Sequence, residues 1–462
     1  MTKNILLIGI AALFSATAMA DNTKDLNKDT ESVSIQQDNA AQQPVEVQHL
    51  SQPQQPVQAQ QPAQAKKSRV SLGGYGEVAL SRMFYSDNTS RYALPDQYKN
   101  APGHGRFDIP HAVIYLGYDF GKGWTFSTEI EFEHGGTGSA YEKEAEEGGE
   151  WESETEKGGE VELEQFYIQK SFAPYANVRI GHLVVPVGLN NSAHEPLNFF
   201  TVYRPEGENT ILPSTWHQTG ISFWGRTKHW RYEAQLLAGL NSDNFQTSTW
   251  INGGTASPVE FEVATKYGAS LRIDNYTIPG LRLGLSGYYG HSTGNSYPAE
   301  ENDVKYKGQT IVGSFDFTYN AHNWIIRGQA DYGYLGDTDI LLDEYNRLNK
   351  KSPYHHTTRV GKNAYAIGIE AGYDIFSQIA KRHNEGEKMY LFARYDKYSP
   401  CADSKTSTSY DYLNVNRIAV GINYMPMKQI VVKLDYSQRF LKSPYNNEPS
   451  LNIGIAYQGW FL

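Results

Sequence analysis

RIAVGINYMPMKQIVVKLDYS, residues 417–437, decides the fold of this 462-residue chain. Its apolar side chains occupy every second position on both sides of a short connector, Met425-Pro426-Met427-Lys428. The apolar face consists of Ile418, Val420, Ile422, Tyr424, Ile430, Val432, Leu434 and Tyr436. The opposite face is mostly small or polar, with Asn423, Lys433 and Asp435 among its members. A period of two is that of a β-strand, so this stretch predicts an antiparallel hairpin.

The same pattern recurs along the chain from Val70 onward. We expect sixteen strands, starting near residues 70, 106, 124, 161, 176, 218, 229, 264, 281, 309, 323, 363, 387, 415, 429 and 450. The connectors between them alternate: Arg226-Thr227-Lys228 is short, for example, whereas residues 135–160 are long. The turn at residues 377–387 takes the place of a short connector but is longer than the other short connectors. Even strand number and alternating connectors are typical of outer-membrane barrels, whereas soluble β-sandwiches and propellers have no reason to alternate.

The predicted fold is therefore all-β: a transmembrane antiparallel β-barrel of about 16 strands over residues 69–462. Its turns would be short and periplasmic, and its loops long and external. The composition agrees, because only 39% of residues are hydrophobic while the chain contains 33 Tyr and 42 Gly. After residue 20, no apolar run approaches the roughly 18 residues of a membrane-spanning helix. The many aromatic residues also argue against a wholly disordered chain.

The N-terminal segments predict export to the outer membrane. Residues 1–20 resemble a secretory signal peptide, with Lys3, an apolar stretch and a cleavage site at Ala18-Met19-Ala20. Residues 21–68 are rich in Gln and Pro, which predicts a flexible periplasmic tether. The single Cys401 cannot form an intramolecular disulfide, and its polar surroundings indicate a loop residue and no catalytic thiol.

The formal charge of −10 is concentrated in one segment. Residues 142–164 contain eleven Glu and two Lys, so they account for −9 of it. This run could attract cations or bridge lipopolysaccharide through divalent ions, but a solvated, flexible loop is the interpretation we favour.

Strand parity predicts which charged residues face the lumen, because charges facing lipid are destabilising. The predicted acidic lining, from strands one to four, is Glu77, Asp119, Glu129, Glu131 and Glu133. The predicted basic lining, mainly from strands five to nine, is Arg179, Arg226, Arg231, Lys266, Arg272, Arg282, Arg327 and Arg394. An acidic wall facing a basic wall would orient polar solutes without excluding either ion sign.

Residues 178–225 resemble the phosphate-selective porin O and P family. The stretch matches that family's Arg-x-Gly-x-x-x-x-Pro-x-Gly-Leu strand end through Arg179, Gly181, Pro186, Gly188 and Leu189. The resemblance implies a sixteen-stranded homotrimeric channel for anions. Where family members often carry a basic residue, this chain has His182-Leu183-Val184-Val185, which weighs against phosphate selectivity.

Residues 186–216 are the candidate constriction loop, folded into the lumen. Their polar side chains would stand at the narrowest point, namely His194, Glu195, Arg204 and Glu206. The alternative is an ordinary external loop. We therefore expect an outer-membrane porin for passive diffusion of small hydrophilic solutes or anions, in contact with outer-membrane lipids and lipopolysaccharide.

Other function classes are less well supported by the sequence. His355-His356 could be combined with upstream acids into a hydrolase or metal site, but no spacing fixes a base against a nucleophile or matches a zinc motif. We expect no enzyme, no cofactor, no metal site and no nucleic-acid partner. The main alternative is a binding or adhesion barrel whose lumen is closed by external loops.

Overall fold

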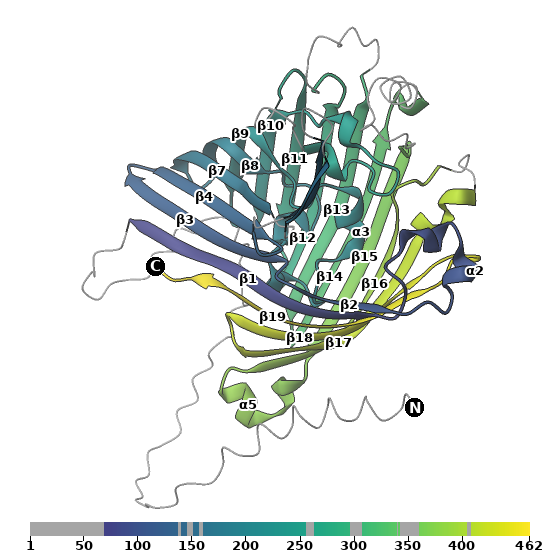
Figure 1. Cartoon of the computed structure of the whole chain (residues 1–462). Coiled ribbons are helices and arrows are strands. Elements are labelled where there is room, and N and C mark those ends of the chain that lie inside the picture. Colours follow the sequence, from purple (N-terminus) through teal and green to yellow (C-terminus); the bar gives the residue numbers. More distant parts are fainter. Residues whose placement is uncertain are drawn as a thin grey trace, which may run out of the picture. The chain divides into compact units, whose positions relative to one another are not determined.

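The computed structural model describes residues 69–136, 140–145, 151–156, 160–255, 263–295, 307–339, 341, 360–403 and 408–462. In these residues one antiparallel sheet closes on itself (Figure 1). Its long strands are β1 (Val70–Met83), β3 (His111–Gly121), β4 (Trp124–Glu133), β7 (Glu160–Ala173), β8 (Ala176–Val184), β9 (His217–Arg226), β10 (Trp230–Ala238), β11 (Tyr267–Asn275), β12 (Leu281–His291), β13 (Gln309–Ala321), β14 (Trp324–Leu335), β15 (Asn363–Asp374), β16 (Lys388–Ser399), β17 (Val415–Met427), β18 (Ile430–Phe440) and β19 (Glu448–Trp460). The first and last strands pair from Gly73 opposite Trp460 to Met83 opposite Ser450, which closes the barrel.

One strand position is interrupted. The short strand β2 (His104–Asp108) and β3 both pair with β1, one after the other along its length. Pro110 lies between them and has no backbone N–H to give to a ladder, which accounts for the break. Counting β2 and β3 as one position, the barrel has sixteen strands, and the predicted fold is confirmed. Every predicted strand start lies within three residues of the observed one.

The barrel wall reverses the polarity of a water-soluble protein. In β13, Asp316 is fully buried, whereas Ile311 and Phe315 on the opposite face are 40% and 47% exposed. The same alternation runs through β11, β15 and β17, where isoleucine and leucine point outward and charged residues are buried. Because charged residues are seldom fully buried unless paired, the interior must supply partners for them.

Connector length alternates around the barrel, as expected. The connectors at one end of the barrel are residues 122–123, 174–175, 227–229, 276–280, 322–323, 375–387 and 428–429, all short except 375–387. The others are residues 84–103, 134–159, 185–216, 239–266, 292–308, 336–362, 400–414 and 441–447. The 375–387 turn is long because it contains a 3₁₀ turn, Ile375–Gln378, and the helix α5 (Ala380–Asn384).

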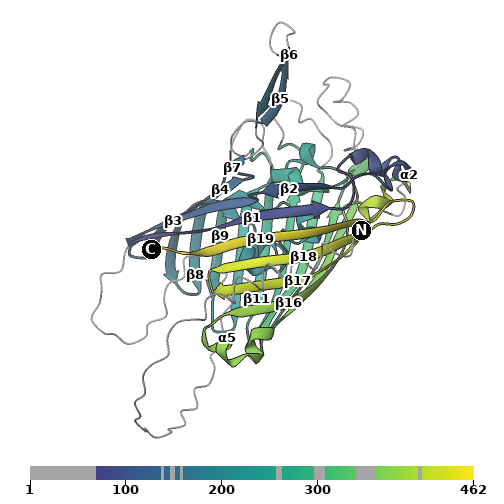
Figure 2. The same cartoon turned by 60° about the horizontal axis from the view of Figure 1, so that its bottom comes forward.

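Part of the acidic run has regular structure of its own. The strands β5 (Ala140–Ala145) and β6 (Trp151–Glu156) form a separate two-stranded sheet (Figure 2). The two strands pair from Ala140–Glu156 to Ala145–Trp151, and ten of their twelve residues belong to the acidic run. In the described part of the chain, no helix is long and apolar enough to cross a membrane.

Candidate functional site: the charged interior of the barrel

The residues between β8 and β9, 185–216, are called the lumen segment below. Gly188 starts its first bend with a φ of +87°, and a Cβ there would lie 2.2 Å from Oε1 of Glu208. The carboxylate of Glu208 occupies this space and accepts hydrogen bonds from the backbone N–H groups of Leu189 (3.0 Å) and Asn191 (2.9 Å). Burial raises the pKa of Glu208. The second glycine of the family-like pattern is thus explained by close packing of a carboxylate against the backbone.

Inner-face side chains of distant strands hold the lumen segment. The ammonium group of Lys433 in β18 donates to the carbonyls of Phe199 (3.0 Å) and Thr201 (2.9 Å). Arg272 in β11 donates to the carbonyl of Gly188 at 2.9 Å. The segment therefore bonds to strands far apart on the barrel wall, and its helix α3 is drawn against the inside of the sheet in Figure 1. Phe200 adds an apolar anchor by stacking on Phe392 of β16, with ring centroids 5.2 Å apart.

The helix α3 (Glu206–Ile211) begins with the most strongly paired carboxylate of the segment. Glu206 contacts Arg439 at 2.8 Å and Arg417 at 3.2 Å, and it accepts the Tyr398 hydroxyl at 2.9 Å. Burial alone would raise the pKa of Glu206, but the two guanidinium groups outweigh it and hold the pKa at about 2. Glu206 is therefore an ionised anchor that fixes the helix against β16, β17 and β18.

Most basic residues on the inner face belong to what we call the ion-pair ladder, in which each arginine contacts a carboxylate of its own strand or of a strand one or two positions away. The first part joins β8 to β13 through the pairs Arg179–Glu233, Arg231–Glu233, Arg231–Asp274, Arg282–Asp274, Arg272–Asp316 and Arg282–Asp316, at 2.5–3.4 Å. The second part joins β14 to β16 through Arg327–Glu370, Arg394–Glu370 and Arg394–Asp396, at 2.6–3.1 Å.

This arrangement pairs basic residues predicted on strands five to nine with carboxylates. Asp274, which was not among the predicted lining residues, shares the inner face of Arg272 two residues earlier on the same strand. Together with Asp316 on β13 it neutralises Arg272 and Arg282. Charges of both signs alternate along this wall, so the wall carries little net field of its own.

The strands β1, β4 and β7 form what we call the acidic wall, consisting of Glu77, Glu129, Glu131 and Glu164. All four are buried, with exposed fractions of 6%, 2%, 1% and 0%. Cationic partners for the wall come from the lumen segment. Arg204 lies 3.6 Å from Glu131, and His194 lies 3.7 Å from Glu129 and 3.9 Å from Glu164. Three acids of this wall, Glu129, Glu131 and Glu164, therefore face charges carried by the lumen segment, unlike the acids of the ladder.

Glu164 points inward because of a β-bulge. Glu129 pairs with Gln165 but Ile130 pairs with Leu163, so Glu164 is the extra residue on β7. Two consecutive side chains, Glu164 and Gln165, are consequently buried. Strand parity counted from the rest of β7 would place Glu164 on the lipid-facing side, which is why sequence reasoning missed it.

Four predicted lining residues lie at strand ends. Asp119 and Lys266 are solvent-exposed, the former beside the turn into β4 and the latter just before β11. Both positions keep the parity of the buried residues on their strands, such as Tyr115 on β3 and Arg272 on β11, so their location in the lumen stays a prediction. Arg226 is half-buried over the ring of Tyr276, and Glu133 is half-buried at the end of β4.

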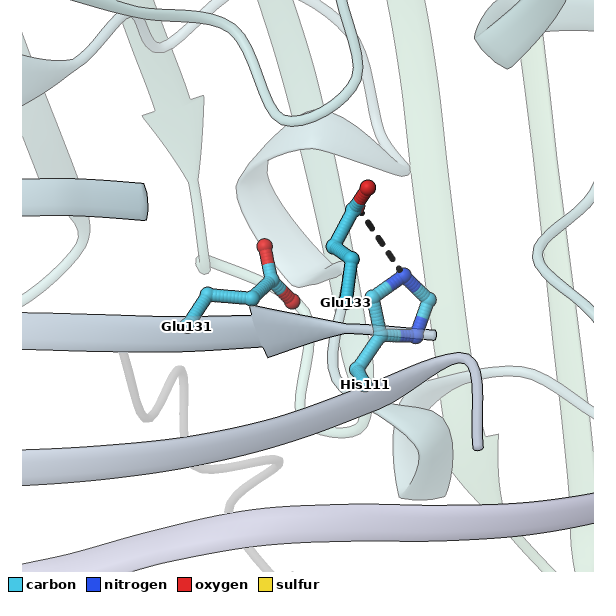
Figure 3. A group of neighbouring side chains, drawn as sticks. All are labelled: His111, Glu131 and Glu133. Carbon is cyan, nitrogen blue, oxygen red and sulfur yellow. Dashed lines mark ion pairs between the residues drawn. The ribbon is translucent and has the colours of Figure 1, made fainter. Parts of the chain in front are cut away.

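Two clusters of His and Glu side chains form where strands and the lumen segment meet. One contains His111, Glu131 and Glu133 (Figure 3), and the other contains Glu129, Glu164 and His194. In the first, Nδ1 of His111 bonds to Glu77 at 2.5 Å and Nε2 lies 3.7 Å from Glu133. No sequence spacing could reveal these groups, because their members come from separate strands and a loop. The His355-His356 pair, residues 1–68 and residues 146–150 and 157–159 of the acidic run lie outside the described residues.

No family model matches the chain. An uncharacterized protein of Aquifex aeolicus (strain VF5) is 27% identical over 403 residues, covering 84% of this chain and 80% of the relative. Among solved structures, the anion-selective porin from Comamonas acidovorans is similar at 8% identity and a TM-score of 0.48, covering 84% of this chain and 99% of that one. The outer-membrane channel DcaP of Acinetobacter baumannii is similar at 10% identity and a TM-score of 0.46, covering 84% and 97%.

Proposed function

We propose that the chain is an outer-membrane porin that lets small hydrophilic solutes and ions diffuse passively. The observation that carries the proposal is the sixteen-strand closed barrel with an apolar outer face and a charged inner face. Small barrels of about eight strands are filled by their own side chains, whereas barrels of about sixteen strands leave an aqueous channel. An apolar outer belt is what the hydrocarbon core of a bilayer requires.

In this proposal the lumen segment narrows the channel. It bonds to Lys433 and Arg272 on different parts of the wall and brings His194, Arg204 and Glu206 into the interior. The passage is then bounded by the acidic wall, the ladder and the segment itself. Deleting Asn191 to Glu208 should widen it, and an unchanged single-channel conductance would contradict the constriction role.

We infer weak ion selectivity and do not favour a phosphate-specific channel. The arginines of the ladder are already engaged by carboxylates at 2.5–3.4 Å, so they offer few free positive charges to phosphate. Reversal potentials in planar bilayers under a salt gradient test this inference. We expect permeability ratios near unity, and a strong anion preference inhibited by phosphate would reject the mixed lining.

The competing proposal is a binding barrel without a solute pathway. It is supported by the long connectors on one end, such as residues 84–103 and 239–266, which could form a recognition surface. Liposome swelling separates the two proposals. Liposomes containing the protein should swell in small sugars if it is a porin, and a barrel closed by loops would give the rate of protein-free liposomes. A homotrimer is proposed from the family resemblance alone, and cross-linking in native membranes would test it.

A further inference from the structure

We propose that Glu129, Glu164 and His194 bind one divalent metal ion, with Zn²⁺ as the best match, and that this ion fastens the lumen segment to the acidic wall. Glu129 and Glu164 stand on the adjacent strands β4 and β7, whereas His194 belongs to the lumen segment. The site would therefore join two parts of the chain that sequence places far apart. Metal binding can be measured without any transport assay, so the proposal does not depend on the porin function.

The distances suit a metal ion. Nε2 of His194 lies 3.7 Å from Oε1 of Glu129 and 3.9 Å from Oε2 of Glu164, and one ligand atom from each residue lies within 4.8 Å of the others. With two sides of 3.7 and 3.9 Å and a third of at most 4.8 Å, a point about 2.0–2.5 Å from all three atoms exists. The Zn–N and Zn–O distances of about 2.0–2.2 Å in proteins fall in this range. The same separations are too long for direct hydrogen bonds.

The atoms that face this point are buried and lack hydrogen-bond partners. They are Oε1 of Glu129, both carboxylate oxygens of Glu164 and Nε2 of His194. The three residues are only 2%, 0% and 3% exposed. Leaving several buried polar atoms unsatisfied in one small volume is costly, and a bound cation would satisfy all of them together.

Neighbouring groups orient the ligands toward the site. Nδ1 of His194 donates to the carbonyl of Asn191 at 3.1 Å, which directs the lone pair of Nε2 at the two carboxylates. The amide of Gln165 donates to Oε2 of Glu129 and leaves Oε1 of that carboxylate facing His194. Support of this kind, with the second imidazole nitrogen bonded to a carbonyl, is a regular feature of metal sites. One imidazole and two carboxylates suit Zn²⁺ with water as a fourth ligand.

Charge balance distinguishes this cluster from its neighbour. Arg204 contacts Glu131 at 3.6 Å, and His111 is bonded by Glu77, so the His111 cluster has partners of its own. The competing account of the Glu129 cluster is a protonated His194. Burial lowers its pKa, but the carboxylates of Glu195, Glu164 and Glu129 outweigh burial and raise the pKa to about 10. One imidazolium cannot compensate two carboxylates, whereas a divalent ion can.

The test is zinc titration of the full chain folded in detergent micelles and stripped with a chelator. Bound zinc is counted by elemental analysis after gel filtration. We expect Glu164→Gln and His194→Gln each to bind one equivalent less than the wild type at concentrations that saturate it. His383→Gln, which changes an exposed histidine on α5, should bind as the wild type does. Glu133→Gln probes the neighbouring cluster and should keep the equivalent that Glu164→Gln loses.

Two results would overturn the proposal: a wild type that binds no zinc, or a Glu164→Gln variant that binds as many equivalents as the wild type. Should His194→Gln fail to fold, X-ray absorption of the zinc-loaded wild type gives the answer without a variant. It should show nitrogen and oxygen ligands at about 2.0–2.2 Å, including imidazole. Absence of an imidazole signature would reject the site, because His194 is the ligand that the lumen segment supplies.

Discussion

The two sides of the barrel interior solve the problem of buried charge differently. In the ion-pair ladder, an arginine and its carboxylates stand on the same strand or on strands at most two positions apart, so the wall neutralises itself. In the acidic wall, Glu129, Glu131 and Glu164 face Arg204 and His194, which are carried by the lumen segment. The ladder should therefore keep its ion pairs without the lumen segment, whereas the acidic wall depends on that segment for its cations. Each experiment below tests that asymmetry, in order of expected effect.

Removing the lumen segment should affect the two walls most unequally. Deletion of Asn191 to Glu208 takes away His194 and Arg204, so the acidic wall loses its cationic partners, while the ladder pairs keep theirs. We expect single-channel conductance to rise severalfold. Selectivity should change little, because the deletion also releases Arg417 and Arg439 from Glu206. An unchanged conductance would contradict the constriction role of the segment.

Breaking the ladder from within should cost stability. Arg272 is 1% exposed and pairs with both Asp274 and Asp316, so Arg272→Met leaves buried carboxylates short of a partner. We expect a loss of about 3–5 kcal/mol in the free energy of unfolding, measured by urea titration in detergent. The control is Arg382→Met on α5, whose arginine side chain is 37% exposed in its pair with Glu387. That change should cost about 0–1 kcal/mol, and equal losses in the two variants would contradict the buried role of the ladder.

Removing one cation from the acidic wall should change selectivity more than stability. Arg204→Gln deletes the positive charge 3.6 Å from Glu131 but leaves a side chain that can still donate hydrogen bonds. Because a ring of acidic groups at a constriction favours cations, we expect the cation-to-anion permeability ratio to rise by roughly a factor of two. Bilayer reversal potentials measure it. Arg382→Met again serves as the control. A shift of equal size in both variants would contradict a position of Arg204 in the ion pathway.

Acid should loosen the end of the lumen segment that is tied to the opposite wall. The pKa of Glu206 is about 2 in the folded chain against a usual value of 4.5, because Arg417 and Arg439 outweigh its burial. Its stabilising contribution is thus complete above pH 4.5 and disappears as the pH falls through about 2. The current noise of wild-type channels should therefore increase as the pH falls from 4.5 to 2, whereas that of Glu206→Gln channels should be high at every pH. If Glu206→Gln channels at pH 6 showed as little current noise as wild-type channels, the anchoring role of Glu206 would be contradicted.

The sequence predicts the strands of the barrel wall but not the contacts in the barrel interior. Alternating segments such as Arg417–Tyr424 located every strand position of the barrel wall, because lipid on one side and polar groups on the other enforce a period of two. Parity also brought Arg272 and Glu131 to the inner face, where both are buried. It failed at Glu164, because a bulge shifts the alternation by one residue. Which acid meets which base depends on strand register and on the path of the lumen segment, and neither is written in local spacing.

The lumen segment also has a mechanical consequence. It is bonded to β11 through Arg272, to β18 through Lys433 and to β4 through Arg204, three places spread around the circumference. Contacts that link distant strands of the wall oppose any change in the shape of its cross-section. The segment thus fixes the shape of the cross-section as well as its free area, and lateral membrane pressure would act on these few bonds first.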